Sequence, residues 1–156
     1  MSLTMSKKMF ANFVKSIFRD ITTFGGLPFH GILILFFLAT NVTIAIDLVI
    51  ALVIIVLIAV ISRSLYYKPR PKELPHDTWL ERLEASSFPS IHAARSMFLA
   101  TYFAILLQSA ATSILLAALA LGVCYSRIHM KRHDFWDLLA GSIVGIATAI
   151  IVLNVL

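Results

Sequence analysis

Residues 27–62 read LPFHGILILFFLATNVTIAIDLVIALVIIVLIAVIS, and this stretch decides the fold because Asp47 is its single charged residue. As one helix it would be about 54 Å long at a rise of ~1.5 Å per residue. The hydrocarbon core of a bilayer is only about 30 Å thick. The stretch therefore predicts a hairpin of two membrane-spanning helices, with its turn between Asn41 and Asp47.

Two more apolar stretches follow along the chain. Residues 96–126 contain no charged side chain and are again too long for one span, whereas residues 138–156 suit a single crossing. The sequence thus predicts an all-α, polytopic membrane helical bundle. Its five expected transmembrane helices cover residues 27–43, 44–62, 91–109, 111–129 and 135–155.

The composition of the chain excludes a water-soluble domain. Of its 156 residues, 60% are hydrophobic and 13% are charged, and the mean hydropathy is +0.92. Soluble domains are about 45–50% apolar and about 25% charged. The same figures exclude a disordered chain, and a single cysteine, Cys124, excludes a disulfide framework and a thiolate metal site.

The segment before the first span has the pattern of an amphipathic helix. Its apolar residues recur at helical spacing, and Lys15, Arg19 and Asp20 interrupt the apolar run that a signal peptide requires. We expect residues 1–26 to lie in the headgroup layer as an interfacial helix, with a distorted spanning segment as the alternative. Residues 27–156 then form a second, membrane-embedded domain.

The cations of the chain are confined to three regions. All 13 lysines and arginines lie before the first span, between residues 63 and 95, or between residues 127 and 132. With five spans, these regions share one side of the membrane, and the two hairpin turns and the C-terminus lie on the other side. The formal net charge of +5 suits an anionic partner, either lipid headgroups or a phosphorylated substrate.

Three segments on this cationic side carry the groups that phosphoryl transfer needs. They are residues 63–71 (RSLYYKPRP), 88–95 (FPSIHAAR) and 126–137 (SRIHMKRHDFWD). Their arginine side chains offer planar donor forks that match phosphate oxygens. A Pro-Ser turn at the start of a helix adds backbone N–H donors and a favourable helix dipole.

Two histidines of these segments can supply a nucleophile and a general acid. His92 and His133 can each act in either role near neutral pH. Asp137 lies four residues after His133, a helical spacing that puts its carboxylate beside the imidazole ring. Together with a clamp of cations, these groups meet the needs of phosphoryl transfer.

The three segments resemble the three-part signature of the type-2 phosphatidic acid phosphatase superfamily of integral-membrane lipid phosphatases. That signature is a basic residue, six residues and Arg-Pro; then Pro-Ser-Gly-His; then Ser-Arg, five residues, His, three residues and Asp. The matching residues are Arg70, Pro71, Pro89, Ser90, His92, Ser126, Arg127, His133 and Asp137. Arg63 stands where the family usually has lysine, and Ile91 where it has glycine. The resemblance covers about residues 45–156.

The resemblance implies a metal-independent phosphatase that uses no cofactor. It implies that His133 attacks phosphorus to form a phosphohistidine, that Asp137 orients His133, and that His92 protonates the departing lipid oxygen. The residues that it implies for holding the phosphate oxygens are Arg63, Arg70, Ser90 and Arg127. Lys68 and Arg95 lie near the motifs and are auxiliary candidates for contacts with the headgroup.

The sequence leaves the substrate and the type of transfer open. Phosphatidate, phosphatidylglycerol phosphate and polyprenyl diphosphates all present a terminal phosphate, and the expected partners are this lipid and the bilayer, not nucleic acid. A phosphotransferase would use the same phosphohistidine, whereas a non-enzymatic protein would only bind anionic lipid. The spacing of His129, His133 and Asp137 also permits a metal site.

Two observations disagree about which side of the membrane holds the cationic segments. The positive-inside rule places these segments in the cytoplasm, and we expect that orientation. Many members of the family, however, act on the outer face, where an anion-binding surface is itself basic.

Overall fold

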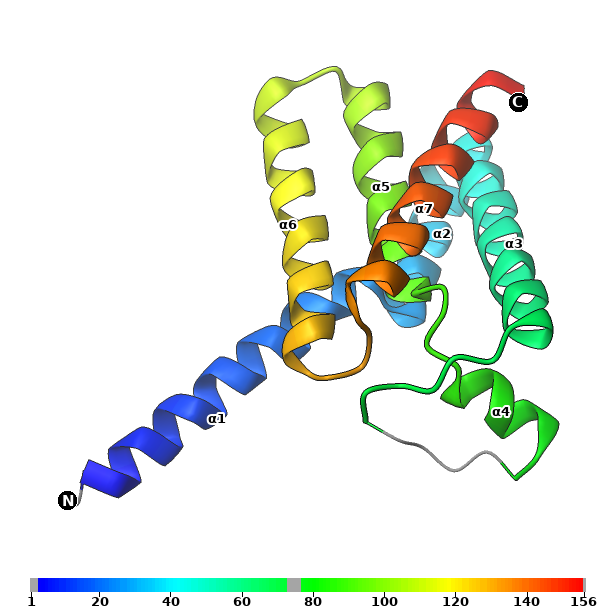
Figure 1. The fold of residues 1–156 in the computed structure, drawn as a ribbon. Helices are drawn as coiled ribbons and strands as arrows, with labels where there is room; N and C mark the ends of the chain where they lie inside the picture. The colour runs from blue at the N-terminus through cyan, green and yellow to red at the C-terminus, as the bar shows by residue number, and fades with distance from the viewer. Residues whose placement is uncertain (1–2, 73–76, 156) are drawn as a thin grey trace.

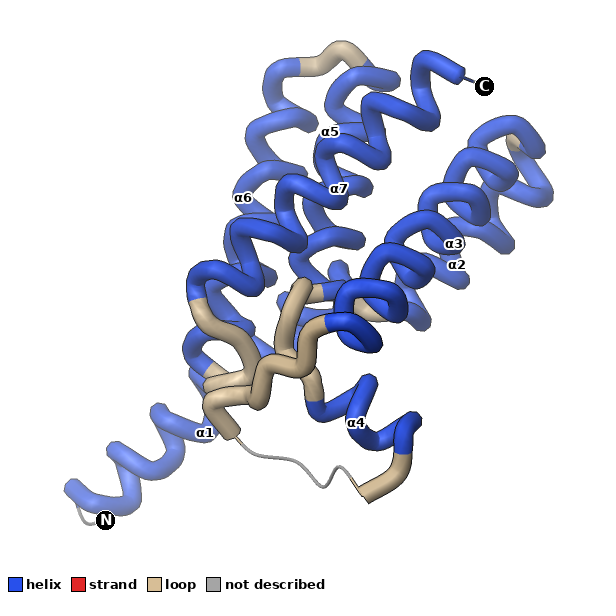
Figure 2. Tube along the Cα trace, turned by 45° about the vertical axis from the view of Figure 1, so that its right-hand side comes forward, coloured by secondary structure: helices blue, strands red, loops and turns tan. Residues whose placement is uncertain are grey.

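The computed structural model describes residues 3–72 and 77–155, and no strand element occurs in this part of the chain. Figure 1 shows the helices, and Figure 2 shows the loops that join them. The elements are α1 (Leu3–Thr22), the 3-10 helix η1 (Thr23–Gly25), α2 (Leu27–Thr40), α3 (Val42–Leu65), α4 (Trp79–Ala85), α5 (Ile91–Leu107), α6 (Ala110–His129) and α7 (Phe135–Val155). The predicted all-α class is confirmed.

Each of the five expected spans coincides with a helix, and both hairpins are present. The first hairpin turns at Asn41, whose side chain caps α3 by accepting a hydrogen bond from the backbone N–H of Ile44 at 3.3 Å. The second turns at Gln108, in the left-handed region with φ of 49°, and at Ser109, which caps α6. Both turns lie at the end of the bundle opposite to the α6–α7 loop (Figure 1).

Length and composition identify fewer independent spans than five. α3, α6 and α7 each meet the requirement for crossing a membrane, and α2 meets it only together with residues 12–25, from which it is bent by 46°. α5 is apolar but has 17 residues, which is about 26 Å of helix. The described helices thus supply three spans, or up to four, and the count of five stays a prediction.

α5 and α7 cross so closely that two positions of α7 have room only for glycine. A Cβ atom on Gly141 would lie 2.4 Å from the carbonyl oxygen of Ser90, and one on Gly145 would lie 2.1 Å from that of Ala94. Small residues four apart on one helix allow such close backbone approach. This packing fixes the start of α5 against the start of α7.

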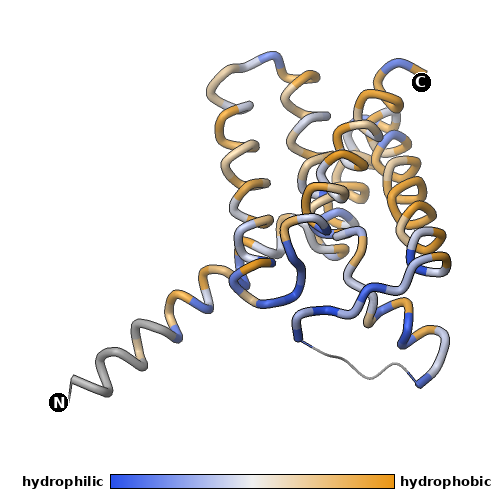
Figure 3. Tube along the Cα trace, viewed as in Figure 1, coloured by the Kyte–Doolittle hydropathy of each residue, from blue (hydrophilic) through white to orange (hydrophobic). Residues whose placement is uncertain are grey.

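The core of the bundle lies between α3, α5 and α7. Its buried cluster consists of Leu48, Ala51, Ile55, Ala94, Phe98, Leu99, Tyr102, Ala149 and Val152. Asp47, the one charged residue of the first apolar stretch, accepts a hydrogen bond from the hydroxyl of Tyr102 at 2.5 Å. Figure 3 shows that most residues of these helices are hydrophobic, and many of their large apolar side chains, such as Val53, Leu57 and Ile143, are exposed, as on the lipid-facing surface of a membrane protein.

α1 leaves the bundle at an angle, and its last turns pack against α6 (Figure 1). The ring of Phe18 lies 4.6 Å from that of His129. Met9, Phe13 and Ile17 are spaced four residues apart and are all exposed, which gives this helix an unpartnered apolar face. The division into an interfacial helix at 1–26 and a membrane domain at 27–156 stays a prediction.

Candidate active site

The three motif segments meet at one end of the bundle, where Figure 3 shows hydrophilic loops. The loop after α3 is held to the turn before α5, because the backbone N–H of Ser87 donates to the carbonyl of Lys68 at 2.8 Å. That turn is held to α7, because the N–H of Ser90 donates to the carbonyl of Asp137 at 3.0 Å. Backbone hydrogen bonds therefore bring the three segments together.

His133 and Asp137 form a buried pair at the start of α7. Their side chains are 2% and 0% exposed, and His133 Nδ1 lies 3.6 Å from Asp137 Oδ2. This separation is longer than a hydrogen bond, and Nδ1 has no hydrogen-bond partner among the described residues. A small rotation of the imidazole ring would make Asp137 the acceptor for Nδ1–H and leave Nε2 free.

The surroundings of His133 favour its neutral form. Burial lowers the pKa of His133, Asp137 offsets part of this shift, and the charges of Arg127 and Arg70 lower it further. A neutral imidazole keeps a lone pair on one ring nitrogen at neutral pH, so this side chain can act as a nucleophile.

Lys68 pairs with the two carboxylates at the start of α7. Its Nζ atom lies 2.8 Å from Asp137 Oδ1 and 2.5 Å from Asp134 Oδ2. Burial would lower the pKa of Lys68, but the hydrogen bonds to Asp134 and Asp137 outweigh that effect and raise it. The structure therefore places Lys68 on the carboxylates behind His133, whereas the sequence suggested a contact with the headgroup.

Asp134 is a residue of the site that sequence reasoning missed. Its Oδ1 accepts from the N–H of Asp137 at 3.0 Å, and its own N–H donates to Asp137 Oδ2 at 3.1 Å. This reciprocal pattern is a capping box at the start of a helix. Two acidic residues three apart, just before an apolar run, are the signal that could have identified it.

Three arginines gather at the site, and none of them forms an ion pair with an acidic residue of the described part of the chain. Arg95 and Arg127 are each 7% exposed, and the Nε atoms of Arg70, Arg95 and Arg127 have no hydrogen-bond partner among the described residues. Burial and the charge of Arg132 lower the pKa of Arg70. Because buried charges without partners are costly, this cluster is suited to receive an anion.

Arg63 is placed differently from the other arginines. Its Nη1 donates to the carbonyl of Leu83 at 3.0 Å and its Nη2 to the carbonyl of Pro89 at 3.1 Å. Both terminal nitrogens are thus engaged by backbone oxygens of α4 and of the turn before α5. To hold a phosphate oxygen as well, Arg63 would have to exchange one of these bonds.

Ser90 and His92 begin α5. Ser90 is fully buried, and its Oγ accepts from the N–H of Ala93 at 3.5 Å, which caps the helix. Arg127, Arg95 and Arg70 are near enough to act electrostatically on the ring of His92, so this ring lies close to the same cluster of arginines. Ser90 and His92 thus add hydrogen-bonding groups to the space beside the arginines.

Ile91 and Gly25 both take part in the packing around the first turn of α5. Ile91 packs against the hydrophobic core cluster, so its extra bulk relative to glycine is accommodated there. A Cβ on Gly25 would lie 2.6 Å from the carbonyl of His92, so η1 presses directly on the first turn of α5. The sequence alone predicts only that Gly25 ends the N-terminal helix.

The described residues do not support the metal alternative. Among them, no group of three or more His, Cys, Asp or Glu side chains is placed to hold a metal ion. His129 is exposed, and its ring contacts that of Phe18 of α1 at a tilt of 38°. Its helical spacing from His133 therefore does not produce a shared site, because α6 ends at His129 and a loop follows.

The comparisons with known proteins agree with this site and fold. The sequence model of the PAP2 superfamily matches residues 44–156, and the chain belongs to that superfamily. The crystal structure of LpxE from Aquifex aeolicus superposes with a TM-score of 0.74 at 23% identity, covering 91% of this chain and 86% of that one, and thus shares the fold. No curated protein matches the chain by sequence. Membership of the superfamily supports a membrane-bound phosphatase that acts on lipids.

Proposed function

We propose that the chain hydrolyses a terminal phosphate of a membrane lipid through a phosphohistidine on His133. The observation that carries this proposal is a cluster of buried and half-buried arginines that form no ion pair among the described residues, next to a neutral histidine backed by a carboxylate. Phosphoryl transfer requires positioning and neutralisation of oxygen charge above all. Arg70 and Arg127 supply that charge, and the buried start of α5 at Ser90 supplies N–H groups and a helix dipole.

In the first step the P–O bond to the lipid breaks. Nε2 of neutral His133 donates its lone pair to phosphorus while Asp137 stabilises the positive charge that develops on the ring. His92 enters this step protonated and transfers that proton to the departing oxygen, so that the lipid leaves as an alcohol and His92 becomes neutral. The phosphoryl group is then bonded to Nε2 of His133.

In the second step water takes the phosphoryl group. Neutral His92 accepts a proton from the attacking water, the P–N bond breaks, and its electron pair returns to His133. The products are inorganic phosphate and the two histidines in their starting states. No metal takes part in either step of this proposal.

Lys68 and Arg63 act behind the reacting groups in this mechanism. Lys68 fixes the carboxylate of Asp137 through the 2.8 Å contact between Nζ and Oδ1, and Arg63 fixes the turn before α5 through Pro89. Arg95, one turn after His92 on α5, has no acidic partner among the described residues and adds to the charge that attracts phosphate.

An apolar cavity beside the site supports a lipid as the substrate. It has a volume of about 280 Å³ and lies between α5, α6 and α7, where Met97, Cys124, Ile128, Phe135 and Leu139 are among its lining residues. Ile128 follows Arg127 directly, and Phe135 lies two residues after His133. An acyl chain in this cavity would therefore leave its headgroup next to the arginines.

Release of phosphate from purified protein tests the proposal. In detergent, we expect hydrolysis of at least one of phosphatidate, phosphatidylglycerol phosphate or a polyprenyl diphosphate, and persistence of this activity in excess EDTA. His133→Ala should abolish both turnover and an acid-labile phosphoenzyme. The control is Arg82→Ala, which removes an exposed cation of α4 and should retain both.

Two results would contradict the proposal. Transfer of the group to an added alcohol in preference to water would make the protein a phosphotransferase. Unchanged activity of His133→Ala would exclude the phosphohistidine.

A further inference from the structure

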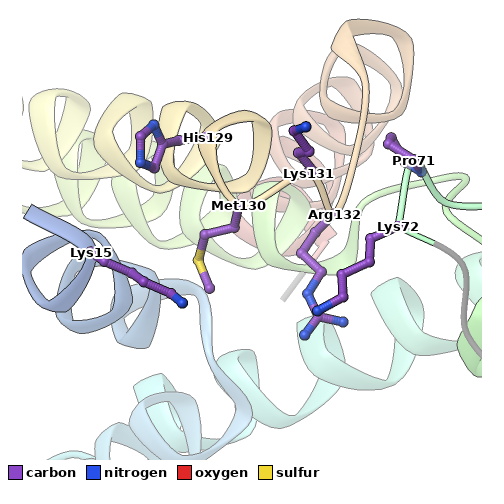
Figure 4. A pocket seen from close by; sticks show the side chains of 7 residues that line it. All are labelled: Lys15, Pro71, Lys72, His129, Met130, Lys131 and Arg132. Carbon is purple, nitrogen blue, oxygen red and sulfur yellow. The ribbon is translucent and has the colours of Figure 1, made fainter. Parts of the chain in front are cut away.

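A second cationic feature lies next to the arginine cluster. A cavity of about 530 Å³ opens between α1, the loop after α3 and the α6–α7 loop, and its lining includes Lys15, Lys72, Lys131 and Arg132. We call it the basic groove. Figure 4 shows Lys15 extending from α1 on one side of Met130, with Lys72 and Arg132 on the other side.

Backbone hydrogen bonds fix the two loops that line the groove. Lys131 adopts the left-handed region with φ of 53°, which is uncommon for a residue other than glycine. Its carbonyl accepts from the N–H of Lys72 at 3.2 Å, and the N–H of Arg132 donates to the carbonyl of Arg127 at 3.0 Å. The two loops that line the groove are thus tied to each other and to α6.

The groove holds positive charge that the described residues do not neutralise. The ion pairs formed among the described residues involve none of Lys15, Lys72, Lys131 and Arg132. The charge of Arg132 also acts on Arg70 and Arg127, so the field of the groove is continuous with that of the arginine cluster. The ligand that suits four clustered cations is a phosphate or another multiply charged anion.

Two residues that line the groove are direct sequence neighbours of residues of the candidate active site. Arg132 precedes His133, and Pro71 follows Arg70, and adjacent Cα atoms are about 3.8 Å apart. We propose that the basic groove binds a second phosphate of the same substrate molecule whose terminal phosphate reacts at His133. This inference rests on the proposed function and narrows its substrate class.

This position distinguishes the three substrates that the sequence leaves open. Phosphatidate has a single phosphate and leaves the groove empty. In a polyprenyl diphosphate the second phosphorus is joined through one bridging oxygen and stays within the arginine cluster. The groove fits a lipid in which a short carbon bridge separates two phosphates, as in phosphatidylglycerol phosphate.

Binding of stable phosphonates tests the groove independently of catalysis. Pentane-1,5-bisphosphonate spaces two anions as a glycerol bridge does, pentylphosphonate carries one, and neither has a P–O–C bond to hydrolyse. We expect the wild-type protein to bind the bisphosphonate about tenfold more tightly by calorimetry. Lys15→Ala and Lys72→Ala should each weaken bisphosphonate binding about three- to fivefold and leave pentylphosphonate within about twofold, since exposed ion pairs are individually weak.

The control for these variants is Arg82→Ala, which removes an exposed cation of α4 outside the groove. It should alter neither affinity. Equal affinity of the wild-type protein for both phosphonates would overturn the inference, as would a bisphosphonate preference that survives in the Lys15→Ala/Lys72→Ala double variant. Loss of the bisphosphonate preference in nanodiscs containing phosphatidylglycerol, but not in nanodiscs of neutral lipid, would assign the groove to neighbouring anionic lipid and also overturn the inference.

Hydrolysis in neutral detergent micelles links the groove to substrate choice. The double variant should lose about tenfold in kcat/KM for phosphatidylglycerol phosphate and stay within about twofold for phosphatidate. Equal losses on both lipids would contradict the inference. If neither lipid is hydrolysed but the bisphosphonate preference depends on Lys15 and Lys72, the proposed function fails while the anion site stands.

Discussion

Arg63 Nη2 donates a hydrogen bond to the carbonyl oxygen of Pro89 at 3.1 Å, so the end of α3 holds the turn from which α5 begins. The same side chain reaches the carbonyl of Leu83 through Nη1 at 3.0 Å. The first and second motif segments are therefore linked directly, before any substrate binds.

Substitution of Arg63 should lower both stability and turnover. Arg63→Ala leaves two carbonyl acceptors without their donor, at about 1–3 kcal/mol for each that stays buried, and lets the Ser90 turn move. Arg63→Lys can restore one of the two bonds and should be intermediate in both Tm and kcat. Unfolding in detergent and steady-state kinetics measure these effects, with Arg82→Ala as the control. Wild-type Tm and kcat in Arg63→Ala would show that Arg63 is only a juxtamembrane anchor.

The two histidines should differ in their dependence on the leaving group. His92→Ala removes the proton donor and should reduce hydrolysis of a lipid phosphate by about 10²–10⁴. Its loss should be smaller on a nitrophenyl phosphate, whose leaving oxygen needs no proton. His133→Ala should lose activity equally on both substrates, because no phosphoenzyme forms. The same ratio of losses in both variants would mean that the roles are wrongly assigned.

The pH dependence of kcat/KM should reflect the lowered pKa of His133. Because burial moves this pKa below 6.5, the neutral nucleophile persists at pH 6.5, and activity should fall only at lower pH. Asp137→Asn removes the group that raises the pKa of His133. The activity that remains should therefore begin to fall only at a still lower pH. Profiles corrected for ionisation of the substrate phosphate measure the shift. A midpoint above 6.5 in the wild-type protein would contradict the neutral-histidine mechanism.

Lys68→Met should move the fall of kcat/KM at acidic pH to a higher pH, opposite to the effect of Asp137→Asn. Without the ammonium group, the carboxylates of Asp134 and Asp137 lose their shared partner, and the more negative surroundings raise the pKa of His133. We expect kcat to fall about tenfold, as when other partners that orient a histidine are removed, with KM changed less. A large rise in KM at unchanged midpoint would instead indicate that Lys68 contacts the phosphate.

Gly145→Ala should separate α5 from α7. The added Cβ would lie 2.1 Å from the carbonyl of Ala94, and overpacking of this kind costs about 1–3 kcal/mol. Tm and activity should fall together, because the contact between Ser90 and Asp137 depends on this crossing. The control is Gly31→Ala on α2, where a Cβ would meet nothing within 4 Å. Gly31→Ala should be neutral or slightly stabilising, and similar effects of both variants would refute the packing argument.

The hydropathy pattern was sufficient to place the helices of the bundle, because an apolar run too long for one span must turn within it, whereas the number of spans stays a prediction. It also predicted correctly that the motif segments meet at one end of the bundle, since helices that alternate in direction return their loops to the same end. The side-chain partners could not be predicted in this way. The contacts of Arg63 with Leu83 and Pro89 depend on where α4 and the turn before α5 pack, which no local spacing specifies.

Lys68 was an auxiliary candidate, but its partners, like those of Gly25, were not predicted, for a related reason. Lys68 lies between two motif residues, and only the fold shows that its Nζ reaches Asp134 and Asp137. Gly25 is needed because η1 contacts α5. The pattern 134–137, by contrast, is a local capping signal, and attention to it would have added Asp134 to the predicted site.

The arginine cluster also has a consequence for the order in which products leave. Once the lipid alcohol has diffused into the bilayer, inorganic phosphate still faces the buried guanidinium groups of Arg95 and Arg127, which have no other anion to pair with. The attraction that recruits the substrate therefore retards release of the second product. Phosphate should dissociate last and compete with lipid, so that turnover slows wherever free phosphate accumulates.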